Sequence, residues 1–163
     1  MEQKLHPKVS EALKEYSIEF TVFECDPELA DTYAFCEKYG FSLSQSANTI
    51  IVVSKNEPII YACCVVLATT KLDVNKKVSE LLSVRRLSFA TAEQTVELTG
   101  MMIGGVVAIG IESMPIYIDS AVFANKEIVM GGGNRSTKLL LNPEELKKIP
   151  NMQIIENLAK LKE

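Results

Sequence analysis

Residues 101–111, with the sequence MMIGGVVAIGI, place three glycines inside an apolar run where packing alone favours side chains. Gly104, Gly105 and Gly110 make no side-chain contacts and add entropy to the unfolded chain, both of which cost stability. We therefore expect a tight bend or a close approach to their backbone that requires the absence of a side chain. A second cluster at 131–133 follows the short apolar segment 126–130. Each cluster alone is typical of a turn between strands. Together they also fit a pocket walled by main chain.

The overall composition limits the class of protein. The 163 residues suffice for one domain, 1–163, with a core that needs no metal or disulfide. A net charge of −4 argues against a protein that coats nucleic acid, although a local basic patch remains compatible with it. The most apolar stretch is too short to span a membrane, so we expect a cytoplasmic protein.

Cysteine and histidine usage predicts no metal site and no cofactor. The four cysteines show no C-x-x-C spacing, and His6 cannot complete a usual zinc site with them. We interpret them as reduced, mostly buried thiols. The adjacent Cys63 and Cys64 point to opposite faces of a predicted strand and therefore cannot act as one dithiol.

Hydrophobic spacing and capping residues predict an α+β domain, with a mixed sheet and flanking helices. Helices are expected where caps and periodicity agree: 6–16, from Asp31 or Thr32 to Tyr39, 73–82, 91–100, and from Asn142 onward. Strands are expected at 18–23, 49–53, 58–68, 86–90, 116–119 and within 127–141, which turns in the second glycine cluster. In the strand at 18–23, alternation predicts that Ile18, Phe20 and Val22 are the buried residues.

Several enzyme classes lack their required residues. Gly105 and Gly110 have the spacing of a phosphate-binding P-loop, but Ile111 and Glu112 stand where Lys-Ser/Thr is needed. A nucleotide-binding G-x-G-x-x-G and a Ser/His or Cys/His nucleophile are likewise unsupported. An enzyme of this sequence would have to work with backbone groups and a few polar side chains.

The order of motifs resembles the YbaK family, the aminoacyl-tRNA deacylases related to the editing domain of bacterial prolyl-tRNA synthetase. The resemblance runs from about Leu5 to Ile149 and rests on QSANTIIVV at 45–53, GGVVAIG at 104–110, YIDSAVF at 117–123 and VMGGGNR at 129–135. It implies the YbaK fold and a pocket for the 3′ end of a mischarged tRNA, with a synthetase as a further partner. It implies ester hydrolysis in which glycine-loop N–H groups hold the oxyanion, without metal or cofactor.

The resemblance also assigns site residues, with departures at some positions. The implied catalytic residues are Asn48, Gly104, Gly105, Ala108 and Gly110, and the implied substrate-binding residues are Phe23, Thr32, Asp119, Gly131, Gly132, Gly133 and Arg135. Asn48 stands where the family has an important lysine, Ala108 where it has a proline, and Phe23 where relatives often have a tyrosine.

Structural explanations compete with these roles. Asn48 can end a loop by bonding its own backbone, and Asp119 can cap the turn at Ser120. Arg135 and Lys138 could hold a phosphate at the second glycine cluster. A further set of basic residues fits either an RNA-facing patch or a solvated helix face: Lys71, Lys76, Lys77, Arg85 and Arg86.

Two functions follow. One is a freestanding trans-editing deacylase, and the other is an inactive relative that binds tRNA, an aminoacyl ligand or a synthetase.

Overall fold

The computed structural model describes residues 5–162 of the chain. The strands are β1 Thr21–Glu24, β2 Ala47–Ser54, β3 Tyr61–Leu67, β4 Thr70–Leu72, β5 Leu87–Phe89, β6 Ile116–Asp119, β7 Ile128–Gly131, β8 Thr137–Leu141, β9 Met152–Ile155 and β10 Ala159–Leu161. The α-helices are α1 Pro7–Glu15, α2 Thr32–Tyr39, α3 Ser79–Leu82 and α4 Ala92–Thr99. Shorter helical turns are η1 Pro27–Leu29, η2 Leu43–Gln45, η3 Val74–Val78, η4 Ser120–Ala124 and η5 Pro143–Lys148.

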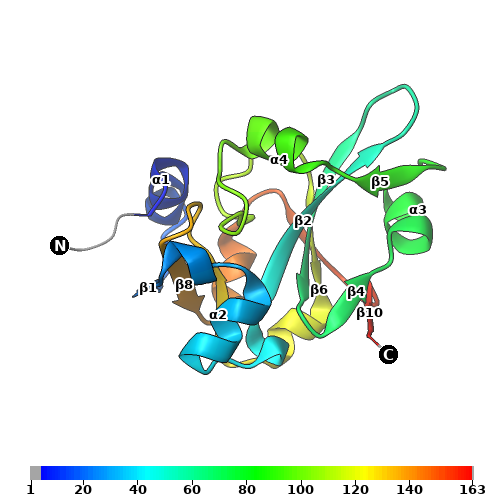
Figure 1. Ribbon diagram of the computed structural model, residues 1–163. Coiled ribbons are helices and arrows are strands. Elements are labelled where there is room, and N and C mark those ends of the chain that lie inside the picture. Colours follow the sequence, from blue (N-terminus) through cyan, green and yellow to red (C-terminus); the bar gives the residue numbers. More distant parts are fainter. Residues whose placement is uncertain (1–4, 163) are drawn as a thin grey trace.

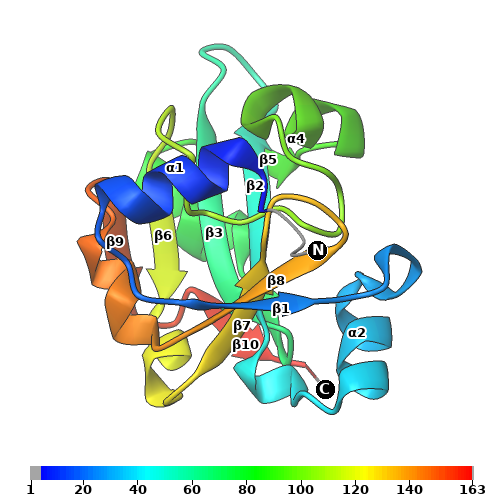
Figure 2. The same cartoon turned by 90° about the vertical axis from the view of Figure 1, so that its left-hand side faces the viewer.

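A five-stranded mixed sheet forms the centre of the molecule, in the order β5-β2-β3-β6-β9. Strands β5, β2 and β3 pair antiparallel, whereas β3, β6 and β9 pair parallel. A three-stranded antiparallel sheet, β1-β8-β7, crosses in front of it in Figure 2. The pair β4 and β10 forms a separate ribbon beside the C-terminal end of the chain in Figure 1. This arrangement confirms the predicted α+β fold with a mixed sheet.

The five-stranded sheet is buried on both faces, which explains the nearly continuous apolar sequence of its central strands. Cys63 faces a core shared with α1 and the three-stranded sheet. Cys64 faces a second core shared with η3 and β10. The prediction that these two thiols point to opposite faces is confirmed.

Several predicted caps form, whereas Asp31 precedes α2 without a capping hydrogen bond from its side chain. Thr91 and Gln94 form a reciprocal capping box at the start of α4, and Gly100 ends that helix at φ 73°. Gly40 ends α2 at φ 78°, and the Asp73 side chain accepts from the Lys76 N–H at the start of η3. Local polar chemistry therefore sets the ends of these helices.

The strand predicted at 18–23 is wrong in position and in its buried face. Ser17 turns the chain at φ 55°, so Ile18 packs into the core before the strand begins. Strand β1 then pairs only with β8 among the described strands, and its inner residue is Phe23 rather than Val22. Phe20 and Val22 are therefore exposed.

Two further helix predictions need correction in type. The segment after Asp73 begins as a π-helical turn before the short α3, and the segment after Asn142 is the 3₁₀ helix η5. Strands β4, β9 and β10 were not predicted, and all three are short. In β9 and β10 the exposure of the residues follows no clear alternation that a pattern could reveal.

Candidate active site

A pocket of about 420 Å³ opens where the two larger sheets separate. Ser46, immediately before β2, forms an isolated parallel bridge with Val129 of β7. Beyond that bridge the two strands belong to different sheets. Residues 46–51 form one wall and residues 129–131 another, with further walls from residues 103–106 and from the segment between β5 and α4. The volume is that of a small-molecule site.

Loop residues Gly104 and Val106 line this pocket. Within residues 5–162, the N–H groups of these two residues donate no hydrogen bond. The neighbouring Gly105 N–H, in contrast, is bound to the Met102 carbonyl oxygen at 2.9 Å. The loop thus carries two unpaired donors on residues that line the pocket and a paired one between them.

Most of the glycines are required by close packing of one backbone on another. A Cβ on Gly105 would collide with the backbone of Asn134, and a Cβ on Gly131 would collide with the backbone of Gly105. The Gly133 N–H donates to the Gly105 carbonyl oxygen at 2.7 Å, which joins the two clusters directly. A Cβ on Gly132 would collide with Thr137. The two clusters predicted separately from sequence are therefore one contact.

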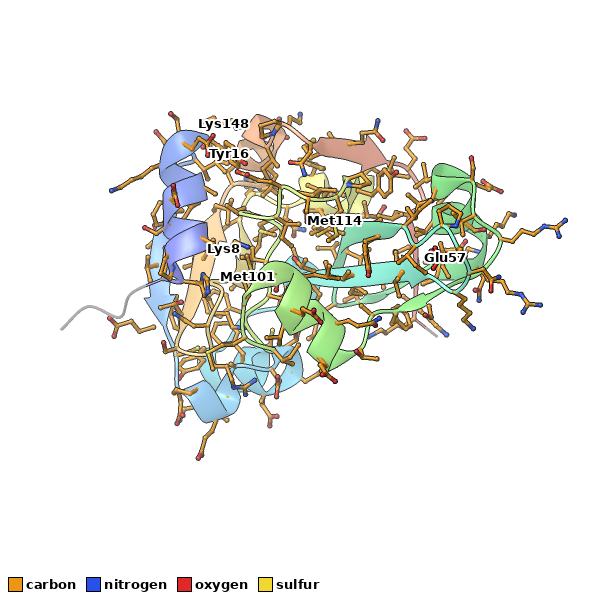
Figure 3. All side chains as sticks on the ribbon, turned by 90° about the horizontal axis from the view of Figure 1, so that it is seen from above. Lys8, Tyr16, Glu57, Met101, Met114 and Lys148 are labelled. Carbon is orange, nitrogen blue, oxygen red and sulfur yellow. The ribbon has the colours of Figure 1, made fainter. Side chains whose placement is uncertain are left out.

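The second half of the glycine loop lies in the core beside α1. Lys8 and Met101 mark this place in Figure 3, where the loop passes the start of α1. Lys8 donates from Nζ to the Thr99 carbonyl oxygen at 3.0 Å, and Gly110, at φ 106°, lies against the Lys8 backbone. Ala108 is fully buried. Neither Ala108 nor Gly110 lines the pocket.

Lys138 on β8 brings a positive charge to the pocket wall. Its side chain is 7% exposed, and its Nζ donates to the carbonyl oxygens of Ala30 at 2.6 Å and Gly104 at 2.9 Å. The ammonium group also lies 5.3 Å from the centre of the Phe35 ring. Burial lowers the pKa of this lysine. The same bonds hold the Gly104 loop to the chain before α2.

Two neighbouring polar residues of β2 line the opposite wall. Asn48 Oδ1 accepts from Thr32 Oγ1 at 2.8 Å, and Thr32, at the start of α2, also lines the pocket. The bond leaves the Asn48 amide nitrogen as a donor group. Thr49 Oγ1 is buried and has no hydrogen-bond partner among the described residues. Such an orphaned hydroxyl is rare in native proteins and needs an explanation.

Arg135 acts as a clamp behind the pocket. Its Nε donates to the Pro27 carbonyl oxygen at 2.9 Å, and its Nη1 donates to the Ile103 carbonyl oxygen at 3.0 Å. Nη1 also pairs with Asp31 Oδ1 at 3.2 Å. Arg135 lies outside the pocket lining. Its bonds tie together three loops that surround Gly104.

Phe23 and Asp119 do not line the pocket either. Phe23 meets the ring of Phe35 edge-on at 5.6 Å between centroids, and Phe35 does line the pocket. Asp119 ends β6 and is 2% exposed. Burial raises the pKa of its carboxyl group, while backbone hydrogen bonds from Ala121, Leu158 and Ser120 act in the opposite direction.

Of the residues implied by the resemblance, the structure brings four together in the pocket lining: Thr32, Asn48, Gly104 and Gly131. Gly105, Gly132, Gly133 and Arg135 support this lining from behind, whereas Ala108, Gly110, Phe23 and Asp119 lie farther away in the fold. Thr49 and Val106 were missed. For Lys138 the sequence offered a signal, a single lysine within the apolar strand TKLLL, which we had assigned to a phosphate at the turn.

Metal ligands do not gather anywhere in residues 5–162: no three His, Cys, Asp or Glu side chains lie together. Over the same residues no helix is long and apolar enough to cross a membrane.

The fold matches a solved candidate trans-editing enzyme for prolyl-tRNA synthetase with a TM-score of 0.80, at 24% identity over 98% of this chain and 100% of that one. It also matches a hypothetical protein with a TM-score of 0.82, at 22% identity over 94% of this chain and 99% of that one. Among curated protein sequences, none is similar enough to count as a relative.

The family model for the aminoacyl-tRNA editing domain matches residues 26–149, a range that contains every pocket-lining residue described above. This chain belongs to the aminoacyl-tRNA editing domain family.

Proposed function

We propose that this chain is a trans-editing deacylase that hydrolyses the ester bond of a mischarged aminoacyl-tRNA. Membership of the editing-domain family supports this proposal, as does the fold shared with a candidate trans-editing enzyme for prolyl-tRNA synthetase. The observation that carries it is the pair of N–H groups on Gly104 and Val106, two pocket-lining residues whose amides have no partner within residues 5–162.

Ester hydrolysis needs what these groups can supply. Attack of water on the ester carbonyl builds negative charge on the carbonyl oxygen. Fixed N–H donors stabilise this charge without having to reorganise, and the loss of one such donor typically costs about 2.7–4 kcal/mol. Gly104 and Val106 are two residues apart on one loop, so both can serve a single oxyanion.

Lys138 adds a fixed positive charge to the same wall. Its bond to the Gly104 carbonyl oxygen holds the loop in place, and the positive charge of its buried ammonium group favours a developing oxyanion. Asn48 cannot provide charge, but its amide nitrogen can donate to the substrate. In this proposal, Lys138 supplies from β8 the charge that Asn48 lacks on β2.

An acid–base side chain is not required. The carboxylate of Asp31 is 69% exposed at the pocket rim and is paired with Arg135, which makes it a poor general base. An aminoacyl ester is already reactive, and the adjacent hydroxyl of the terminal ribose can relay a proton. The uncharged Asn48 also fits the second candidate, an inactive relative that binds tRNA, an aminoacyl ligand or a synthetase.

A panel of misacylated tRNAs separates the two candidates. We expect the purified protein to release the amino acid from at least one member with saturation kinetics. The matched control is Lys14→Gln, a change at an exposed lysine of α1 outside the pocket, which should hydrolyse equally fast. If every panel member stays charged with enzyme in excess of tRNA, the deacylase proposal fails and the binding function remains.

A further inference from the structure

A second hollow of about 840 Å³ lies over the ribbon formed by β4 and β10. We call it the lysine groove, because Lys71, Lys160 and Lys162 line it. Lys71 and Lys160 are directly opposite each other across the two strands. Lys162 is two residues beyond Lys160 and therefore extends to the same side of the ribbon.

Like charges placed directly opposite each other destabilise a strand pair. One carboxylate, that of Asp73, is found among the described lining residues, and its Oδ2 lies 3.8 Å from Lys160 Nζ. Its Oδ1 already accepts from the Lys76 N–H at the start of η3. Three lysines and one carboxylate thus line the groove on a protein of net charge −4, and the carboxylate pairs with Lys160. An anionic ligand would relieve this repulsion.

The lysine groove adjoins the proposed active site. Phe89 of β5 lines both hollows and is 55% exposed. On another side, Lys162 Nζ donates to Tyr33 Oη at 2.7 Å and lies 5.3 Å from the centre of that ring. Tyr33 follows Thr32 of the pocket lining. The groove therefore begins where the pocket opens.

We propose that the lysine groove binds the single-stranded 3′ end of the tRNA, with Phe89 stacking on a base near the ester and the three lysines contacting the following phosphates. This inference rests on the proposed deacylase function. In an aminoacyl-tRNA the acyl group is attached to the terminal ribose. An acyl group held in the pocket therefore places the terminal base and the next phosphates just outside it.

The chemistry of the groove fits single-stranded RNA. Binding of single strands combines cationic groups along the backbone with aromatic side chains on which bases stack. The groove supplies both kinds of group in contiguous positions. Of the five basic residues that the sequence suggested as an RNA-facing patch or a solvated helix face, Lys71 lines the groove, together with Lys160 and Lys162, which are distant in sequence.

The test measures RNA binding and ester hydrolysis separately. The binding probe is an RNA hairpin with a single-stranded CCA end and no amino acid attached. Its binding is measured by fluorescence anisotropy across a salt series. The variant combines Lys71→Gln, Lys160→Gln and Lys162→Gln. The matched control combines the same change at three exposed lysines that line neither hollow: Lys14, Lys38 and Lys126.

We expect the groove variant to raise the Kd of the hairpin at least tenfold at low salt, and the control variant to leave it within about twofold. The slope of log K against log salt should fall by about two, since each single-strand phosphate contact contributes about 0.7. Phe89→Leu should weaken binding about tenfold through lost stacking, whereas Phe89→Tyr should retain it. An equal Kd for the groove and control variants overturns the inference.

Hydrolysis of an aminoacyl ester of adenosine, which carries no phosphate, tests the pocket alone. The groove variant should cleave this small ester at the wild-type rate and lose activity only on the aminoacylated hairpin. If the wild-type protein cleaves neither ester but binds the hairpin through the three lysines, the deacylase proposal fails and the RNA site stands. If it cleaves both esters and the lysines do not matter, the groove inference alone fails.

Discussion

The pocket wall at Gly104 and the backbone contact at Gly105 are made by adjacent residues, but the backbone N–H groups of these residues differ in their hydrogen bonding. At Gly105 the N–H is bound to Met102, the carbonyl oxygen accepts from Gly133, and the missing Cβ makes room for Asn134. At Gly104, which lines the pocket, the N–H is unpaired within the described residues, although a Cβ there would collide with the Arg135 side chain. Close packing therefore requires both glycines, and only Gly104 also leaves an N–H group available.

This comparison changes what a glycine cluster indicates. Missing side chains alone do not identify a binding site, because most of these glycines are explained by contacts within the protein. The N–H groups of the pocket-lining residues Gly104 and Val106 are the stronger evidence, since nothing in the described fold satisfies them.

The largest expected loss of stability comes from a substitution at Gly105, where two backbone segments pack against each other. Gly105→Ala would drive a methyl group into the Asn134 backbone, and neither backbone can move without disturbing the other glycine cluster. We expect a loss of about 3 kcal/mol in the free energy of unfolding, measured by urea denaturation.

The control for that change is Gly40→Ala at the end of α2. No heavy atom lies within 4 Å of a Cβ at Gly40, although its φ is 78°, so only backbone strain of about 1–2 kcal/mol is expected. Gly105 does not have a positive φ, so a loss no larger than that of Gly40→Ala would mean that the contact with Asn134 does not require a bare backbone at Gly105.

Sequence reasoning recovered the fold better than the site, for a physical reason. Capping boxes, C-terminal glycines and apolar periodicity act locally, so Thr91, Gly100 and the central strands could be assigned from neighbouring residues alone. The pocket depends on long-range contacts instead. Gly105 meets Asn134 and Lys138 meets Gly104 across about thirty residues of chain, and no local pattern encodes these pairings.

Two details of the site show the same limit. The resemblance pointed to Asn48, which does line the pocket, but it could not show that a lysine from β8 reaches the same space. It also implied the whole glycine loop, whereas the fold divides that loop between the pocket and the core. The strand at 18–23 was misplaced because Ser17 turns the chain with a positive φ, which a serine in the sequence does not indicate.

In the pocket, Lys138→Met tests whether the Lys138 ammonium group stabilises the oxyanion together with the unpaired N–H groups. Methionine nearly conserves the volume but removes the ammonium group from the Gly104 carbonyl oxygen. We expect kcat/KM on the misacylated substrate to fall about 100-fold, the typical loss for one oxyanion-stabilising group. Because burial lowers the pKa of Lys138, the wild-type rate should decline on the alkaline side at a lower pH than for an ordinary lysine. That decline should vanish in the variant.

A second substitution separates charge from folding. Adding Asn48→Lys to Lys138→Met returns a cation to the pocket from the opposite wall, and we expect it to recover at least about tenfold of the lost activity. Recovery of stability without activity would argue that Lys138 only anchors the loop.

Thr49→Val has the smallest expected effect, and its sign should differ between stability and activity. Thr49→Val removes a buried hydroxyl that has no partner, so the free energy of unfolding should rise by about 1 kcal/mol. In the proposed function this hydroxyl turns into the pocket to meet the substrate, so deacylation should nevertheless fall about tenfold. Thr137→Val is the matched control. Its hydroxyl is also buried but bonds Asn134 Oδ1 at 2.7 Å, so its loss should cost about 1 kcal/mol of stability. If Thr49→Val destabilises the protein as Thr137→Val does, the hydroxyl serves the fold, and its orphaned state no longer points to a ligand.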